Sequence, residues 1–423
     1  MTRPRMERLM KAKWTVLALS LLLGCPWPAM ATTADALATL KRNAGAAHSD
    51  AVWVQKDGDV LLQGGSIGAG QPIHLMSATK SVVAIAIGML LDDGRLASLD
   101  TPVSAIYPEW RQGKKRDITV RMLLDHTSGL QNVANAGMEL EGAPDLVKLA
   151  LAAELVADPG TTFSYNNKAT NLLSGIVQRL SGMPVDEYLD ARLFKPLGIT
   201  THAWMKDERG TPMAMAGLSL AARDLAAIGQ FMLDGGLAPG GQRLMSERSV
   251  ALLTAESARS PEVGLLWWRI PQWERYRLAD QAEARMAERG VQAHVSQALL
   301  AAGGRSFGSK TDLLAFLAEQ LGPNWPQQYG EQITGRGLKL SDLFDVQRGP
   351  TAAYAANGYL GQHLVIVPEQ RLVAVRLIQR RDTHASPQDD YALFPADVLR
   401  LAGTFETSPT AATVGTPAGA HAH

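Results

Sequence analysis

The chain has 423 residues, 46% of them hydrophobic and 19% charged, so it is long enough for one large domain or two interleaved ones. Its 41 basic residues balance its 41 acidic residues, and this balance gives no sign of a nucleic-acid partner or of an anionic membrane surface. The lone cysteine, Cys25, excludes a disulfide framework within the chain.

Residues 1–31 have the pattern of an export signal. A basic segment precedes an apolar one, and a small-residue cleavage site ends at Ala31. A second interpretation stays open, because residues 22–25 resemble a bacterial lipoprotein box in which Cys25 would carry a lipid anchor. We favour cleavage after Ala31. The mature protein is then expected to be periplasmic or secreted, with a lipoprotein anchored to the membrane through Cys25 as the alternative.

Two β-prone segments follow, 51–55 and 60–63, and the Asp57-Gly58 pair between them predicts a hairpin. A glycine-rich stretch then leads to the segment around which we expect the chain to be organised, Ser77 to Asp93.

Ser77 and Lys80 are three residues apart, so in a helix they lie on the same face. A serine hydroxyl needs a neighbouring base at neutral pH, and lysine is that base only if its pKa falls from about 10.4 towards 7. Residues 82–91 are apolar all round, as in a helix buried on every side, and Gly94 is well placed to end it. We expect Ser77 to be a nucleophile and Lys80 its base, although an exposed serine and lysine near a helix start have the same spacing.

Further segments make this pattern specific. They are Leu-Asp-x-Pro-Val at 99–103, Ile-Thr-Val-Arg-x-Leu-Leu at 118–124, His-Thr-Ser-Gly-Leu at 126–130 and Tyr-x-Asn at 165–167. Together with Ser-x-x-Lys they resemble the serine β-lactamase-related hydrolases, a superfamily that includes class C β-lactamases, D,D-peptidases, EstB-type esterases and 6-aminohexanoate-dimer hydrolases. The matching segments cover residues 50–135, 155–270 and 352–378.

The resemblance implies additional site residues. It places Tyr165 beside Ser77 and Lys80, as a proton relay if its surroundings favour the phenolate. It gives Asn167 the role of orienting Lys80 or the substrate. An oxyanion needs two donors, and the resemblance supplies the backbone N–H of Ser77 and that of the residue after the glycine of a Lys-Thr-Gly strand.

This last motif departs from the family pattern. The Lys310-Thr311 pair is followed by residues that indicate a helix start, so we reject it. Residues 356–362 fit better. Gly358 there allows close approach of the substrate, Tyr359 supplies the second oxyanion N–H, and Ala356 stands where a lysine or histidine would be. Because alanine cannot bind the carboxylate shared by penicillins and D-Ala-D-Ala peptides, esters and amides without that group are favoured as substrates.

His126 permits another interpretation, a Ser-His-Asp triad with Asp100 or Asp125. The family has a structural turn at this segment and Lys80 already serves as the base, so we expect His126 to form structural hydrogen bonds, and we also reject Ser128 as a nucleophile. The sequence has no cluster with metal-ligand spacing and no phosphate-binding glycine loop after a strand, so we expect neither a metal nor a cofactor.

The resemblance implies an α+β fold of the β-lactamase/transpeptidase-like kind, with an antiparallel sheet flanked by helices, a mostly helical region, and the active site at their junction. We assign the parts in chain order. They are a signal at 1–31, the sheet region at 32–120 and 259–405, the helical region at 121–258, an insertion at 269–350 and a disordered tail at 406–423.

The insertion shows amphipathic helical patterns at 276–302 and 313–321, and a last helix is expected at 389–401. A lid or substrate-selecting role for the insertion and a structural or partner-contact role both stay open.

The expected function is that of an exported serine hydrolase, which cleaves an ester or amide of a small molecule or peptide through an acyl-Ser77 intermediate. A penicillin-binding D,D-peptidase or β-lactamase is the enzymatic alternative. A non-catalytic cell-envelope binding protein on the same scaffold is the alternative of another class, and the presence of Ser77, Lys80 and Tyr165 together argues against it.

Overall fold

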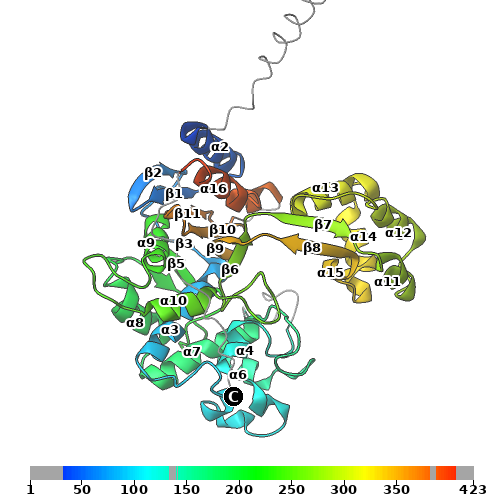
Figure 1. The fold of residues 1–423 in the computed structure, drawn as a ribbon. Helices are drawn as coiled ribbons and strands as arrows, with labels where there is room; N and C mark the ends of the chain where they lie inside the picture. The colour runs from blue at the N-terminus through cyan, green and yellow to red at the C-terminus, as the bar shows by residue number, and fades with distance from the viewer. Residues whose placement is uncertain (1–31, 133–139, 141, 382–386, 406–423) are drawn as a thin grey trace, which may run out of the picture.

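The computed structural model describes residues 32–132, 140, 142–381 and 387–405 (Figure 1). The expected signal with Cys25 and the expected tail at 406–423 lie outside these ranges, so both stay predictions.

The main sheet within the described ranges has six strands, and every neighbouring pair is antiparallel. In spatial order they are β2 (Asp59–Gly64), β1 (Ala51–Lys56), β11 (Leu372–Leu377), β10 (Gln362–Val367), β9 (Thr351–Gly358) and β6 (Trp268–Pro271). The predicted hairpin is confirmed by the pairing of β1 with β2. Because β1 also pairs with β11, the two ends of the chain meet in the middle of the sheet.

Helices cover both faces of this sheet (Figure 1). Side chains alternate along a strand, so each strand serves two cores. On one face, Val52 and Val54 pack with α2 (Thr33–Ala46) and α16 (Phe394–Ala402). The other face packs with α3 (Thr79–Asp92) and α9 (Ala222–Leu233) in the largest core cluster of the described residues.

The stretch between α3 and β6 is mostly helical. Its α-helices are α4 (Val120–Leu124), α6 (Leu146–Ala152), α7 (Asn167–Ser181), α8 (Val185–Leu189), α9 and α10 (Glu247–Thr254). Short one-turn segments lie at Val103–Ala105, Pro108–Trp110, Lys114–Asp117 and Asp190–Phe194. A small sheet, which the sequence did not predict, joins β3 (Ile73–His74), β5 (Leu218–Leu220) and β4 (Ala203–Trp204).

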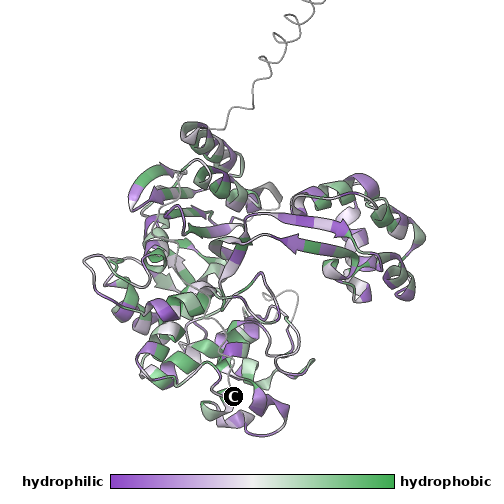
Figure 2. Ribbon diagram, viewed as in Figure 1, coloured by the Kyte–Doolittle hydropathy of each residue, from purple (hydrophilic) through white to green (hydrophobic). Residues whose placement is uncertain are grey.

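Residues 274–348, the inserted module, project from the main sheet on a stalk formed by β7 (Glu274–Leu278) and β8 (Phe344–Arg348) (Figure 1). The stalk carries α11 (Ala282–Glu288), α12 (Ala293–Leu300), α13 (Lys310–Leu321), α14 (Trp325–Gln332), a turn at Thr334–Arg336 and α15 (Leu340–Leu343). The module has a hydrophobic core of its own, and its helices carry both hydrophobic and hydrophilic residues (Figure 2).

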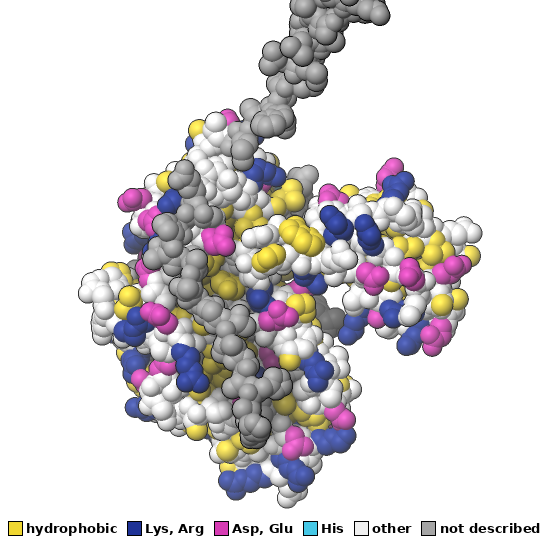
Figure 3. Space-filling model, viewed as in Figure 1, with side chains coloured by type: hydrophobic (Ala, Val, Ile, Leu, Met, Phe, Trp, Pro, Cys, Tyr) yellow, Lys and Arg dark blue, Asp and Glu magenta, His cyan; other side chains and the backbone are white. Residues whose placement is uncertain are grey.

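The stalk corrects one expectation, because residues 276–278 belong to a strand and not to a helix. Arg275 and Arg277 face solvent, whereas Tyr276 and Leu278 contribute to the module core, so this stretch follows the two-residue period of a strand. The view of Figure 3 shows basic and acidic side chains interspersed over the visible face of the module.

The buried helix α3 is confirmed, and it begins at Thr79. Every residue from Thr79 to Leu90 is buried, and Gly94 ends the helix with a φ of +67°, which an L residue adopts only under strain. A one-turn 3₁₀ helix, η2 (Met76–Ala78), precedes α3 and carries Ser77.

Strand β6 begins at Trp268, after the chain turns at Leu266, where φ is +62°. One further boundary differs from expectation. The last helix begins at Phe394, after a 3₁₀ turn, η8, at Pro387–Asp390. In the described part of the chain, no helix combines the length and the apolar character needed to cross a bilayer.

Candidate active site

Ser77 and Lys80 meet at the junction of η2 and α3. The Lys80 Nζ lies 2.9 Å from the Ser77 Oγ, which is within hydrogen-bond reach of a base and its nucleophile. The same Nζ donates to the backbone carbonyl of Met215 at 2.6 Å. The helical spacing predicted from the sequence therefore brings the two side chains into direct contact.

Burial favours the neutral amine of Lys80. The residue is only 3% exposed, and burial holds the pKa of its ammonium well below the usual value. The acceptors that the described structure gives it are a hydroxyl and a carbonyl, with no carboxylate to stabilise the charged form. A neutral amine in this position donates one hydrogen to Met215 and keeps its lone pair for the proton of Ser77.

Asn171 fixes the carbonyl that holds Lys80. Its side-chain Oδ1 accepts the backbone N–H of Met215 at 3.1 Å, and its own helix, α7, begins one turn earlier at Asn167. Asn171 and Met215 are site residues that the sequence reasoning missed. A buried asparagine four residues after Asn167 on the same helix face was the available signal.

Tyr165 lies beside both catalytic groups, as the resemblance implied. Its hydroxyl is hydrogen-bonded to the Ser77 side chain, and its ring lies 4.9 Å from the Lys80 Nζ. Burial raises the pKa of Tyr165 to about 12, and the hydrogen bond to Ser77 offsets only part of this effect. Burial therefore favours the neutral phenol over the phenolate on which the relay role was conditional, and the role of Tyr165 stays a prediction.

His126 has the structural role that we expected. Its Nδ1 accepts the backbone N–H of Asn166 at 3.2 Å, and its carbonyl accepts the N–H of Ser164 at 2.8 Å, so it holds both sides of Tyr165 in place. Burial lowers the pKa of His126 to about 3, which keeps the imidazole neutral.

The two carboxylates proposed for a triad are engaged elsewhere. Asp100 accepts from Arg121 at 2.8 Å, and Asp125 accepts from the Thr127 hydroxyl at 2.6 Å. Neither carboxylate is hydrogen-bonded to His126 in the described structure, and the triad interpretation therefore lacks its acid.

We predict that His126→Asn retains ester hydrolysis within about tenfold of wild type, because asparagine tolerates the φ of +59° and its Oδ1 can accept the Asn166 N–H. His126→Ala should instead destabilise the fold by about 1–3 kcal/mol, since a buried N–H loses its acceptor. Urea unfolding and steady-state kinetics measure both effects. A loss of activity as large as that of Ser77→Ala, with the asparagine variant still folded, would revive the triad.

The oxyanion hole depends on the close approach of β9 to η2. A Cβ at Gly358 would lie 2.3 Å from the carbonyl oxygen of Leu75 and 3.1 Å from the Cβ of Met76, so only glycine fits there. Tyr359, just past β9, and Ser77 line the same cavity, and the pairing of their N–H groups in an oxyanion hole stays a prediction. The Ser77 N–H lies in the first turn of its helix, where backbone donors have no intrahelical partner.

Gly358→Ala is therefore expected to lower kcat by about 10²- to 10³-fold, the cost of losing one oxyanion donor, because the added methyl group must push β9 away from Leu75. Gly330→Ala in α14 is the matched control, since a Cβ there meets nothing within 4 Å. Steady-state kinetics on one ester gives kcat for both variants. Equal activity of the two would contradict the assignment of Tyr359 to the oxyanion hole.

A cavity of about 240 Å³ opens beside the nucleophile. The described residues that line it carry no formal charge, and they are Ser77, Tyr165, Trp268, Asn357, Gly358 and Tyr359. Trp268, which the sequence reasoning missed, stacks its ring against Tyr165 with centroids 6.5 Å apart. Ala356 is fully buried in the core behind this cavity, so no cation stands at its position.

Asn167 is the candidate that the structure does not bring into contact with the others. It is the first residue of α7, and its N–H donates to Asn132 at 3.3 Å. Among the described residues, no hydrogen bond links its side chain to Lys80, and it does not line the cavity. Its role stays a prediction. Lys310 begins helix α13, in agreement with the helix start for which we rejected the Lys310-Thr311 pair as the strand motif.

Within the described ranges, no group of three or more histidine, cysteine, aspartate and glutamate side chains is arranged to hold a metal ion. The chemistry that this site can perform is nucleophilic attack by Ser77, with proton transfer through Lys80 and Tyr165.

A serine, a buried lysine and a phenol on this α+β scaffold define the class of the β-lactamase-related serine hydrolases. The Beta-lactamase family model matches residues 31–396, and the chain belongs to that family. The resemblance and the expected fold are thereby confirmed.

The chain is similar to several named proteins. It is 31% identical over 249 residues to the 6-aminohexanoate-dimer hydrolase of Paenarthrobacter ureafaciens, a match that covers 53% of this chain and 63% of that protein. It is 33% identical over 156 residues to the esterase EstB of Burkholderia gladioli, covering 31% of this chain and 39% of that protein. The chain thus spans less than two thirds of the length of these curated relatives.

A solved structure supports the fold. The D-alanine carboxypeptidase AmpC from Burkholderia cenocepacia matches with a TM-score of 0.54 and 16% identity, over 88% of this chain and 99% of that chain.

Proposed function

We propose that the protein is an exported serine hydrolase that cleaves an ester or amide bond in a small molecule or peptide through an acyl-Ser77 intermediate. The observation that carries this proposal is the buried Lys80 amine, 2.9 Å from the Ser77 hydroxyl and without a carboxylate partner in the described structure.

The proposed reaction begins when neutral Lys80 takes the proton of Ser77 and the Ser77 Oγ attacks the substrate carbonyl carbon. The N–H groups of Ser77 and Tyr359 stabilise the tetrahedral oxyanion. The neutral phenol of Tyr165 then donates its proton to the leaving oxygen or nitrogen while it regains one from Lys80. A water molecule then attacks the acyl carbon while Lys80 takes its proton. The acyl–Oγ bond breaks, Lys80 returns the proton to the Ser77 Oγ, and the acid is released.

The lining of the cavity supports a substrate without a carboxylate next to the scissile bond. No lining side chain is charged, and alanine stands at position 356. The names of the two relatives, a 6-aminohexanoate-dimer hydrolase and an esterase, agree with cleavage of esters or amides. Action outside the cytoplasm rests on the sequence pattern of residues 1–31 and is part of the same proposal.

The experiment compares a short-chain p-nitrophenyl ester with a chromogenic cephalosporin, using purified protein that begins at residue 32. We expect ester turnover and at least about 100-fold lower kcat/KM for the cephalosporin, because its carboxylate meets no cation in the cavity. The reverse preference would favour the β-lactamase or D,D-peptidase alternative. Turnover of neither, with no labelling of Ser77, would favour the non-catalytic alternative.

A further inference from the structure

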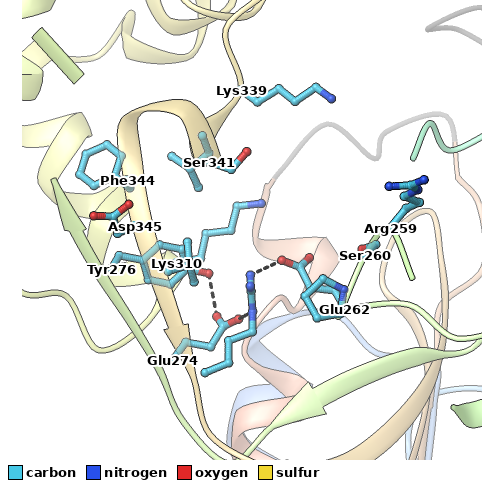
Figure 4. Close-up of a pocket in the computed structure, with 14 residues that line it drawn as sticks. Arg259, Ser260, Glu262, Glu274, Tyr276, Lys310, Lys339, Ser341, Phe344 and Asp345 are labelled. Carbon is cyan, nitrogen blue, oxygen red and sulfur yellow. Dashed lines mark hydrogen bonds and ion pairs between the residues drawn. The ribbon is translucent and has the colours of Figure 1, made fainter. Parts of the chain in front are cut away.

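A second cavity lies away from Ser77, between the inserted module and the main body. Its volume is about 600 Å³, which is in the range of sites that hold small organic ligands. The module side is formed by both strands of the stalk and by the starts of α13 and α15, and the body side by residues 259–262 (Figure 4). It shares no lining residue with the cavity at Ser77.

The two glutamates of the lining are already paired. Arg348 donates to Glu274 at 3.0 Å and forms an ion pair with Glu262, and the Tyr276 hydroxyl donates to the second oxygen of Glu274 at 2.7 Å (Figure 4). Asp345 lies directly across the stalk from Arg277 in the strand register. Glu262 and Glu274 therefore have partners of their own, whereas the exposed Asp345 carboxylate forms no ion pair with another described residue.

The lysines of the lining have no such partners. Lys310 and Lys339 are exposed, and neither ammonium forms an ion pair with another described residue. Arg259, on the opposite wall, donates its Nε–H to the Gly160 carbonyl, and its terminal N–H groups remain available for a ligand. Figure 4 shows Lys339 and Lys310 on the module side, facing Arg259 and Ser260 across the cavity. The unused hydrogen-bonding capacity here consists of the cationic donors of Lys310, Lys339 and Arg259, hydroxyl groups, and the single carboxylate of Asp345.

Apolar surface completes the lining. Leu340, Val346 and Pro261 belong to it, together with the edges of Tyr276 and Phe344, which are otherwise buried in the module. A ligand that matches both features has a negatively charged end and a compact apolar body.

We propose that this cavity binds an organic anion, a carboxylate or a phosphate monoester with an apolar body, whose charge is held by Lys310 and Lys339. Such a ligand contacts the module and the body at once, so it fixes the stalk against residues 259–262. The site is independent of the acylation chemistry, because no catalytic group belongs to its lining.

The test uses titration calorimetry with benzoate, phenyl phosphate and the uncharged analogue benzyl alcohol. The variant is Lys310→Gln with Lys339→Gln. The control with the same net charge is Lys41→Gln with Lys148→Gln, two exposed lysines that do not line the cavity. All these positions are on the surface, and thermal unfolding without ligand checks that each variant folds.

We expect benzoate or phenyl phosphate to bind wild type and the control alike, and the Lys310/Lys339 variant to bind about tenfold or more weakly, the cost of losing charge-assisted contacts. The stronger of the two probes identifies the anion as carboxylate or phosphate. Ser77→Ala should bind as wild type does, which separates this site from the catalytic one.

Three outcomes would overturn the proposal. They are equal binding of benzyl alcohol, equal loss of binding in the control, and no binding of either anion to wild type up to about 10 mM.

Discussion

Ser77→Ala is expected to lower kcat/KM for a short-chain p-nitrophenyl ester by about 10⁴-fold or more, because the variant lacks the oxygen that forms the acyl-enzyme. This loss corresponds to about 5 kcal/mol or more of transition-state stabilisation. The substitution removes one hydroxyl that contacts Lys80 and Tyr165, so the fold should persist. Steady-state kinetics with wild type beside the variant measures the effect.

Ser128→Ala is the matched control for this experiment. Ser128 is a buried serine in the turn that follows His126, and its Oγ accepts only the nearby N–H of Leu130, at 3.4 Å, in the described structure. We expect this variant to retain activity within a few-fold of wild type. Loss of activity in Ser128→Ala with retention in Ser77→Ala would reverse the assignment of the nucleophile.

Lys80→Met is expected to lower kcat/KM by about 10²- to 10⁴-fold, the usual contribution of a positioned general base. Methionine is apolar and unbranched, so it fits the buried position of Lys80. The oxyanion donors and Tyr165 remain, and for that reason the loss should be smaller than that of Ser77→Ala. Full activity of a folded Lys80→Met protein would exclude Lys80 as the base.

Lys80 also gives a dependence on pH whose sign follows from its burial. Its pKa is lowered in the folded state, so between that lowered value and about 10.4 the unfolded chain binds more protons than the native one. The contribution of Lys80 to the free energy of unfolding therefore rises with pH across this window. Urea unfolding at several pH values should show a smaller rise in Lys80→Met. Identical slopes would mean that Lys80 is charged in the folded protein.

The local pattern of the sequence was enough to predict the surroundings of Lys80. The apolar run after Lys80 predicted a helix buried on every side, and burial lowers the pKa of this lysine. Gly358 was expected to allow close approach of the substrate, whereas the structure places the carbonyl of Leu75 against it, where only a residue without a Cβ fits.

The features that escaped prediction depend on contacts between distant segments. Lys80 is held by a main-chain carbonyl, that of Met215, and a carbonyl has no signature in the sequence. The protonation of Tyr165 depends on how deeply its ring is buried beside a neutral amine, which only the folded structure gives. In the inserted module, a short alternating stretch at 274–278 was hidden by the helical pattern that follows it.

The measurement that tests the central claim most directly is mass spectrometry of the protein after reaction with a fluorophosphonate, followed by peptide mapping. The account predicts one phosphonyl adduct per chain, on the peptide that contains Ser77. This adduct should be absent from Ser77→Ala and should form more slowly in Lys80→Met. An adduct on another residue, or equal labelling of wild type and Ser77→Ala, would contradict it.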